Sequence, residues 1–252
     1  MHPARNLRGP HAGPRRATGA ALLVLTWLAI GCASSAPQAY APPAEESVRP
    51  GVNDSFLASD LDVDSFVERF EGESREVFAQ RGAIVDAMGL RPGAVVADVG
   101  SGTGAFLSAL AGAVGPKGKV LALDIAPPFV ERLAERARRE GLPQVEARLC
   151  GENSVELPAR SIDAAFICDV YHHFEFPRGT MGSIHHALRD GGQVVIVDFE
   201  RIPGVSSEWT LGHVRAGKDE VVAEMASFGF ALVEELEIPG LRENWVGRFH
   251  KQ

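Results

Sequence analysis

Cysteine is scarce in this sequence, which has three among its 252 residues: Cys32, Cys150 and Cys168. They form no Cys-x-x-Cys pair and no Cys/His set with zinc-site spacing, and three thiols cannot build a disulfide framework. No two histidines stand four residues apart beside a carboxylate, another common metal-site pattern. We therefore predict no metal site. We expect Cys150 and Cys168, which end apolar runs, to be small buried core residues.

An excess of basic residues is lacking too. Lysine and arginine number 25 against 33 aspartates and glutamates, and the formal net charge is −8. Because binding to phosphates calls for a basic patch, we expect no nucleic-acid partner. The hydrophobic content of 45% is ordinary for a globular protein. The length suits one α/β domain with extensions.

Long hydrophobic runs are absent as well. The apolar run at residues 20–30 has 11 residues, whereas a helix needs about twenty to span a bilayer. The residues before it carry four arginines and no acid, and it ends in Leu28-Ala-Ile-Gly-Cys32. A basic start, a short apolar core and small residues are typical of a secretory signal. The segment resembles a bacterial lipoprotein signal, although Ala29 stands where that family usually has leucine.

This resemblance implies a signal peptide over residues 1–31, a lipid on Cys32, and an exported lipoprotein that is anchored in the membrane and faces the periplasm. Two alternatives remain: an export segment that is uncleaved or cleaved without lipidation, and a misassigned start, which would leave the protein cytoplasmic. The pair Arg15-Arg16 is compatible with twin-arginine export. Residues 32–52 are rich in proline and alanine and predict an extended tether.

After the tether, the apolar residues recur at spacings typical of helices and strands. Apolar residues at helical spacing predict two amphipathic helices within residues 53–92. From residue 93 to 252, short apolar runs alternate with helical stretches. The expected strands cover residues 94–99, 119–123, 144–150, 162–168, 193–199, 231–237 and 245–250. The expected helices cover residues 103–113, 127–140, 178–188 and 218–228.

This alternation predicts an α/β fold, with a mostly parallel seven-stranded sheet and helices on both faces. The link between the last two strands, residues 238–244, is too short for a crossover helix, so the last strand should be antiparallel. Such a sheet is Rossmann-like. Ligands of open α/β sheets bind at the carboxyl ends of the strands.

A glycine-rich loop follows the first strand, in the order Asp98-Val-Gly100-Ser101-Gly102-Thr103-Gly104. Glycine lets the backbone approach a ligand closely. The spacing Gly-x-Gly-x-Gly differs from the Gly-x-Gly-x-x-Gly of dinucleotide loops. Asp98 would repel a pyrophosphate but attract an ammonium group. The second strand ends at Asp124, an acid suited to the two hydroxyls of a ribose in either kind of cofactor.

Four segments resemble successive motifs of class I S-adenosylmethionine-dependent methyltransferases of the type 11, ubiquinone-biosynthesis-like sort. They are Val95–Gly104, Val120–Ala126, Ile162–Phe174 and Leu188–Val197. The resemblance covers about residues 75–250 and implies S-adenosyl-L-methionine as the cofactor. We expect residues 93–252 to form the methyltransferase domain and residues 53–92 to fold over the cofactor as a lid. Phe70, Glu71 and Arg75 are the lid candidates, and a solvated charged face is the alternative for them.

The resemblance assigns the cofactor contacts as well. Asp98 would approach the amine of the methionine part through water, and the loop Gly100, Ser101, Gly102, Thr103 and Gly104 would line that part. Asp124 would hold the ribose, and Ile125 would flank the adenine. Glu152 and Asn153 are the two candidates for the contact with the adenine amine, at a place where the family usually has Gly-Asp-Ala.

Methyl transfer from a sulfonium requires alignment and, for some acceptors, removal of a proton. Asp169, His172 and His173 follow the fourth expected strand and are the candidate catalytic groups, with Asp169 also a candidate cofactor contact. The alternative for the histidines is to position the loop. Arg215 and Lys218 could meet an anionic acceptor or pair with Asp219 and Glu220.

We expect a small-molecule acceptor, which the sequence does not identify. Two other functions compete with methyl transfer: binding of the cofactor or S-adenosylhomocysteine without turnover, and a nicotinamide-dependent oxidoreductase. The sequence predicts no oligomeric state.

Overall fold

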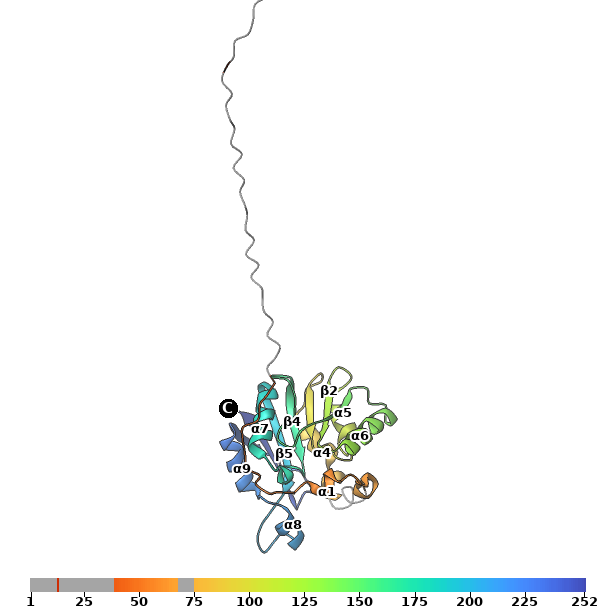
Figure 1. Cartoon of the computed structure of the whole chain (residues 1–252). Helices are drawn as coiled ribbons and strands as arrows, with labels where there is room; N and C mark the ends of the chain where they lie inside the picture. The colour runs from red at the N-terminus through yellow and green to blue at the C-terminus, as the bar shows by residue number, and fades with distance from the viewer. Residues whose placement is uncertain (1–12, 14–38, 68–74) are drawn as a thin grey trace, which may run out of the picture. The chain divides into compact units, whose positions relative to one another are not determined.

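A seven-stranded sheet lies at the centre of the computed structural model, which describes residues 13, 39–67 and 75–252 (Figure 1). The strand order is β3-β2-β1-β4-β5-β7-β6. The strands are β1 (Val95–Val99), β2 (Lys119–Asp124), β3 (Val145–Leu149), β4 (Ile162–Cys168), β5 (Leu188–Phe199), β6 (Phe230–Glu235) and β7 (Asn244–Lys251).

The directions of the strands confirm the predicted fold class. β1 pairs in parallel with β2 and β4, and the outer pairs β2–β3 and β4–β5 are parallel too. β7 runs antiparallel to both β5 and β6. The short link after β6 can only turn back, so β7 inserts between β6 and β5. The strand order reverses between β1 and β4, which is the switch point at which open α/β sheets bind ligands.

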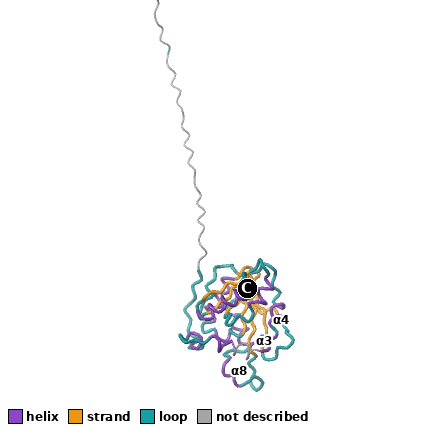
Figure 2. The backbone as a smooth tube through the Cα atoms, turned by 90° about the vertical axis from the view of Figure 1, so that its right-hand side faces the viewer, coloured by secondary structure: helices purple, strands orange, loops and turns teal. Residues whose placement is uncertain are grey.

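Helices cover both faces of the sheet (Figures 1 and 2). They are α1 (Asp54–Leu57), α3 (Arg75–Ala79), α4 (Arg81–Ala87), α5 (Leu107–Val114), α6 (Pro127–Arg139), α7 (Pro177–Ala187), α8 (Glu208–His213) and α9 (Lys218–Ser227), with a single 3-10 turn, η1 (Tyr171–His173). The structure differs from the sequence-based expectation in several places, and β5 begins at Leu188 rather than at residue 193. The region of residues 53–92 contains short helices rather than two long ones, α5 begins at Leu107 rather than at residue 103, and neither α8 nor η1 was expected.

Alternating side chains of the strands form two buried layers. One layer contains Ala97, Leu121 and Ile167 and packs against α7 and α9. The other contains Val96 and Phe166 and packs against α4, α5 and α6. Because both faces are buried, the strands read in the sequence as continuous apolar runs rather than as an alternating pattern.

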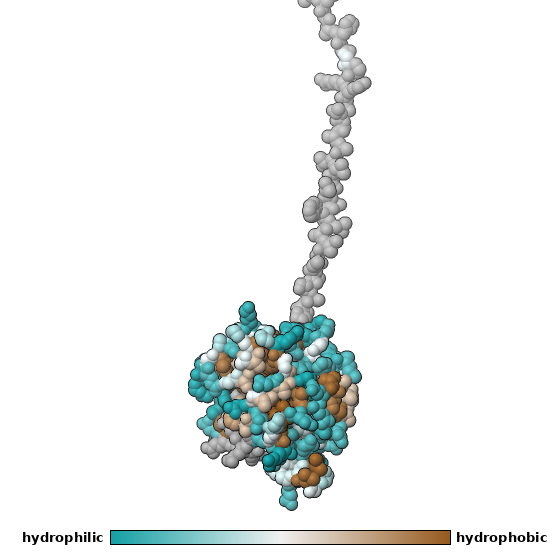
Figure 3. All heavy atoms as spheres, turned by 180° about the vertical axis from the view of Figure 1, so that it is seen from behind, coloured by the Kyte–Doolittle hydropathy of each residue, from teal (hydrophilic) through white to brown (hydrophobic). Residues whose placement is uncertain are grey.

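The lobe that carries α8 projects from the rest of the domain (Figure 1). Hydrophobic side chains gather on it (Figure 3). Ile202, Val205 and Trp209 are exposed there, Val205 by 78%. His213, the last residue of α8, lies where the chain returns to the domain.

The described part of the expected tether, residues 39–52, contains neither helix nor strand and contacts the domain. The Glu45 carboxylate accepts hydrogen bonds from the backbone N–H groups of Arg178 and Gly179 at the start of α7. Arg49 donates to the backbone carbonyls of Gly212 and His213. The predicted signal segment and Cys32 lie outside the described residues. Within residues 39–67 and 75–252, no helix combines the length and the apolar character needed to cross a membrane.

Candidate functional site

A pocket opens at the carboxyl ends of β1, β2 and β4, where the fold predicts a ligand site. It is lined by the loop after β1, the end of β2, the loop after β3 and the turn after β4. Side chains from the N-terminal segment and from α3 close it. The lining residues are Asn53, Phe56, Val77, Phe78, Asp98, Val99, Gly100, Ser101, Gly102, Thr103, Ala105, Phe106, Asp124, Ile125, Phe129, Cys150, Gly151, Glu152, Val155, Cys168, Asp169, Val170, His173, Phe174 and Thr180.

Gly100 passes close to the turn after β4. Its φ is +71°, and a Cβ at this position would lie 2.5 Å from Cγ1 of Val170. Any side chain would therefore be strained and would collide with that turn. The glycine spacing thus lets the first loop lie against β4 and leaves backbone groups at the pocket wall.

Asp98 is a buried carboxyl group in the pocket, only 4% exposed. Burial raises its pKa to about 7, the hydroxyl of Ser101 opposes this by donating a hydrogen bond to it, and the nearby charge of Asp124 adds to the rise. A cation bound beside Asp98 would favour the ionised carboxylate and reverse the shift.

Asp124 holds the glycine loop against the end of β2. Its Oδ2 accepts a hydrogen bond from the Gly102 N–H at 2.9 Å, and its Oδ1 accepts one from the Ala126 N–H at 3.0 Å. Burial raises the pKa of this carboxyl group, and the backbone hydrogen bonds oppose the rise. A carboxylate has lone pairs beyond these two bonds, and they are available to a ligand's hydroxyls.

Asp169 is strained at the turn after β4. Its φ is +52°, a left-handed conformation that aspartate tolerates better than most residues. The side-chain amide of Asn244, at the start of β7, donates a 2.6 Å hydrogen bond to Asp169 Oδ1. The strain and this bond together fix the carboxylate at the pocket wall.

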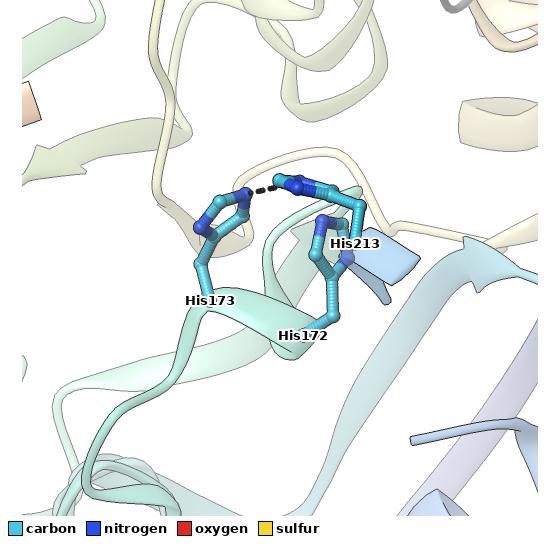
Figure 4. Close-up of side chains that lie close together, drawn as sticks. All are labelled: His172, His173 and His213. Atoms are coloured by element: carbon cyan, nitrogen blue, oxygen red, sulfur yellow. Dashed lines mark hydrogen bonds between the residues drawn. The ribbon is translucent and has the colours of Figure 1, made fainter. Parts of the chain in front are cut away.

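The two adjacent histidines of η1 have different surroundings. His173 lines the pocket. His172 does not line it: its ring is buried and its Nδ1 lies 2.7 Å from Oδ1 of Asp198. His213 reaches the same place from α8, with its Nε2 3.2 Å from Nε2 of His173 (Figure 4).

The profile of a family described as "Methyltransferase domain" matches residues 90–239, which is more than half of the chain. The chain belongs to this methyltransferase family.

Curated methyltransferases resemble it in sequence. Nocamycin O-methyltransferase from Saccharothrix syringae is 33% identical over 134 residues, which is 53% of this chain and 48% of that protein. The ubiquinone/menaquinone biosynthesis C-methyltransferase of Hydrogenovibrio crunogenus is 30% identical over 163 residues, 64% of this chain and 62% of that protein. This methyltransferase chain therefore spans about half to three fifths of the length of these relatives.

Solved structures share the fold. A SAM-dependent methyltransferase from Aquifex aeolicus matches with a TM-score of 0.67 and 23% identity, over 75% of this chain and 97% of that one. The mitomycin 7-O-methyltransferase matches with a TM-score of 0.59 and 16% identity, over 80% and 65%. The predicted methyltransferase and its predicted cofactor, S-adenosylmethionine, are confirmed at the level of the family.

The pocket of this methyltransferase domain fits that cofactor. Asp98 offers a buried carboxyl group that an ammonium group would favour in its ionised form, Gly100 brings backbone close to the pocket, and Asp124 offers carboxylate oxygens suited to ribose hydroxyls. Among the other predicted contacts, Ser101, Gly102, Thr103 and Ile125 line the pocket, whereas Gly104 is not among the lining residues. Of the two adenine candidates, Glu152 lines the pocket and Asn153 is exposed outside it.

Several site residues escaped the sequence analysis. Asn53 and Phe56 reach the pocket from the N-terminal segment, and Asp198 and Asn244 position other residues from β5 and β7. No local pattern marks them, because the fold brings them in from distant segments. The lid candidates at residues 70 and 71 lie outside the described residues.

The two basic candidates for an anionic acceptor have other partners. Arg215 forms a bidentate ion pair with Glu224, and Lys218 pairs with Glu235. Neither lines the pocket. The ion-pair partners expected from the sequence were Asp219 and Glu220. The observed partners lie farther along α9 and on β6.

Proposed function

We propose that the protein transfers the methyl group of S-adenosylmethionine to a small, largely apolar acceptor. One observation carries the proposal. A single pocket contains both the residues that suit the cofactor, from Asp98 to Asp124, and a second set at its other wall. That second set combines Asp169 and His173 with apolar side chains. Donor and acceptor can therefore meet in one enclosed space.

The cofactor supplies an activated methyl group on a sulfonium. The residues of the chain bind and orient. Asp98 attracts the ammonium group, and Asp124 accepts hydrogen bonds from the ribose. Asp169, fixed by Asn244, and His173 line the pocket near the acceptor and would orient it. His172 acts as a positioning residue in the transfer, because its ring bonds to Asp198 and it is not among the residues that line the pocket.

The acceptor is proposed to be neutral and apolar because the walls around His173 are. Phe56 packs against the His173 ring, Val77, Phe78 and Phe174 also line the pocket, and no lysine or arginine is among the described lining residues. An anionic acceptor would have no partner in that lining. The nocamycin and ubiquinone/menaquinone enzymes, by their names, also act in small-molecule chemistry.

A labelled methyl group tests this proposal. The full chain is incubated with radiolabelled S-adenosylmethionine and an extract of cell envelopes, and label is sought in small molecules. We expect label transfer that Asp124→Asn reduces about tenfold or more, since a hydrogen bond to a charged group contributes about 1.5–3 kcal/mol. Asp86→Asn, at an exposed position on α4, is the matched control. Cofactor binding without any transfer would favour the non-catalytic alternative.

We also propose that the protein is exported and lipidated at Cys32. The support is the basic, apolar and small-residue pattern before that cysteine. Labelled fatty acid followed by membrane fractionation should mark the wild type and not Cys32→Ala. Label that persists in the mutant would contradict lipidation at this residue. Since S-adenosylmethionine is made in the cytoplasm, export would also require a supply of cofactor outside it.

A further inference from the structure

Three histidines from two separate loops meet beside the pocket (Figure 4). His172 and His173 come from η1 after β4, and His213 ends α8 after β5. One ring nitrogen of each lies within 4.8 Å of the other two. The ring centroids are 4.4 Å (His172 to His173), 5.1 Å (His172 to His213) and 5.0 Å (His173 to His213) apart. Three imidazoles this close are the first requirement of a metal site.

The spacing of the nitrogens suits a tetrahedral ion. Nε2 of His173 and Nε2 of His213 are 3.2 Å apart. Two imidazole nitrogens at about 2.0–2.1 Å from a tetrahedral zinc ion are about 3.3 Å apart. The third contact requires the His172 nitrogen, which lies within 4.8 Å of the other two, to move closer to them.

Asp198 prepares His172 as a ligand. The side chains of His172 and Asp198 are each only 2% exposed, and Nδ1 and Oδ1 are 2.7 Å apart. The backbone N–H groups of His172 and Phe199 also donate to the Asp198 carboxylate, which fixes its orientation. Because a carboxylate only accepts, Nδ1 is the donor in this pair, and Nε2 is the nitrogen left for a metal ion. This carboxylate–histidine pairing is the usual outer shell of a metal-bound histidine.

Packing holds the other two rings in place. Trp209 stacks on His213, with centroids 4.5 Å apart and an angle of 19°. Phe56 meets His173 edge-on at 5.2 Å, and Asn53 donates to the His173 carbonyl. Arg49 donates to the carbonyl at the end of α8. The rings are thus oriented by neighbours outside the cluster, as ligands of a preformed site are.

We propose that His172, His173 and His213 bind one divalent transition-metal ion of the zinc class. Three neutral imidazoles are the donor set that zinc, iron, cobalt and nickel accept, and that calcium and magnesium do not favour. A hydrogen bond between His173 and His213 would account for their contact. It would not account for a third imidazole beside them with a buried carboxylate behind it.

The ion would lie at the acceptor end of the pocket, because His173 lines the pocket wall. Three protein ligands leave a coordination position open, as in catalytic zinc sites. A hydroxyl or thiol bound there would have a lowered pKa. The role of the ion in activating an acceptor rests on the proposed function. Binding of the ion does not, because it can be measured without any methyl transfer.

The test uses the full chain after treatment with a chelator. Cobalt(II) is added as a spectroscopic probe, and zinc is titrated by calorimetry. We expect one equivalent of either ion per chain and the intense visible absorption of tetrahedral cobalt(II). Weak absorption of the octahedral type in the wild type would overturn the proposal. This measurement requires no variant.

Variants then assign the ligands. His213→Phe, which keeps an aromatic ring on Trp209, should lose the tight site, and Asp198→Asn should weaken binding about 10–100-fold. His250→Ala, at an exposed histidine of β7, should bind like the wild type. Zinc should raise the melting temperature of the wild type and not that of His213→Phe. Equal binding by the wild type and His213→Phe would mean an adventitious site elsewhere and would overturn the assignment.

Discussion

At the scale of single residues, Asp98 couples cofactor binding to pH. Its raised pKa of about 7 means that the carboxyl group of the free protein is largely protonated in mild acid. The ammonium group of the cofactor requires the carboxylate. Below about pH 7, binding must therefore release a proton, and the dissociation constant should rise by up to about tenfold per pH unit. Above that pH, this group should have no effect.

Calorimetry of S-adenosylmethionine binding between about pH 8 and about pH 5 checks this prediction. Repeating the titration in buffers of different ionisation enthalpy counts the proton released. Asp98→Asn should bind more weakly and lose this pH dependence. A dissociation constant that stays flat down to about pH 5 in the wild type would contradict the role given to Asp98.

A second residue-scale prediction compares two glycines. In Gly100→Ala, the new Cβ would lie 2.5 Å from Val170 at a φ of +71°, so we expect a loss of about 2 kcal/mol in the free energy of unfolding, with weaker cofactor binding. Gly112 lies in α5 with open space around it. Gly112→Ala should stabilise the protein by about 0.5–1 kcal/mol. Denaturant titration measures both changes, and equal effects would be inconsistent with a close approach at Gly100.

At the scale of secondary-structure elements, Glu76 ties α3 to the turn before β7. Its carboxylate accepts hydrogen bonds from the backbone N–H groups of Arg242, Glu243 and Asn244. Val77 and Phe78, the next two residues, line the pocket. Asn244, at the other end of the tie, holds Asp169. The Glu76 carboxylate thus links two parts of the pocket lining, α3 and Asp169.

Glu76→Ala should loosen this wall. We expect faster amide hydrogen exchange in α3 and the following α4, a loss of about 1 kcal/mol in stability and weaker cofactor binding. The control is Glu131→Ala, a glutamate on α6 that does not line the pocket. Unchanged exchange in α3 would show that Glu76 does not hold the element.

The elements differ in how well the sequence predicts them. β4 has the predicted bounds, Ile162–Cys168, because a buried parallel strand is a plain apolar run between turns. The start of α5 was placed four residues too early, because residues 100–106 wind around the pocket before the helix begins. α8 has six residues in a segment without a helical period, and its one local signal is the cap Ser207, whose hydroxyl accepts a hydrogen bond from the Thr210 N–H.

At the scale of the whole molecule, the sequence predicts the half of the site that is local and misses the half that is assembled. The cofactor loop and Asp124 stand in contiguous motifs. His213 is 40 residues from His173, and Asn244 is 75 residues from Asp169. Asn53, which donates to the carbonyl of His173, is 120 residues away from it. Contacts between residues so far apart in the chain follow from the fold topology, and no local pattern in a single sequence indicates them.

The most direct test of the central claim is a pair of calorimetric titrations of the full chain, one with S-adenosylmethionine and one with NAD. The charge of Asp98, the glycine spacing and the family all predict one binding site for S-adenosylmethionine, competed by S-adenosylhomocysteine and weakened by Asp124→Asn but not by Asp86→Asn. NAD should give no comparable heat. Tight binding of NAD with none of S-adenosylmethionine would contradict the account.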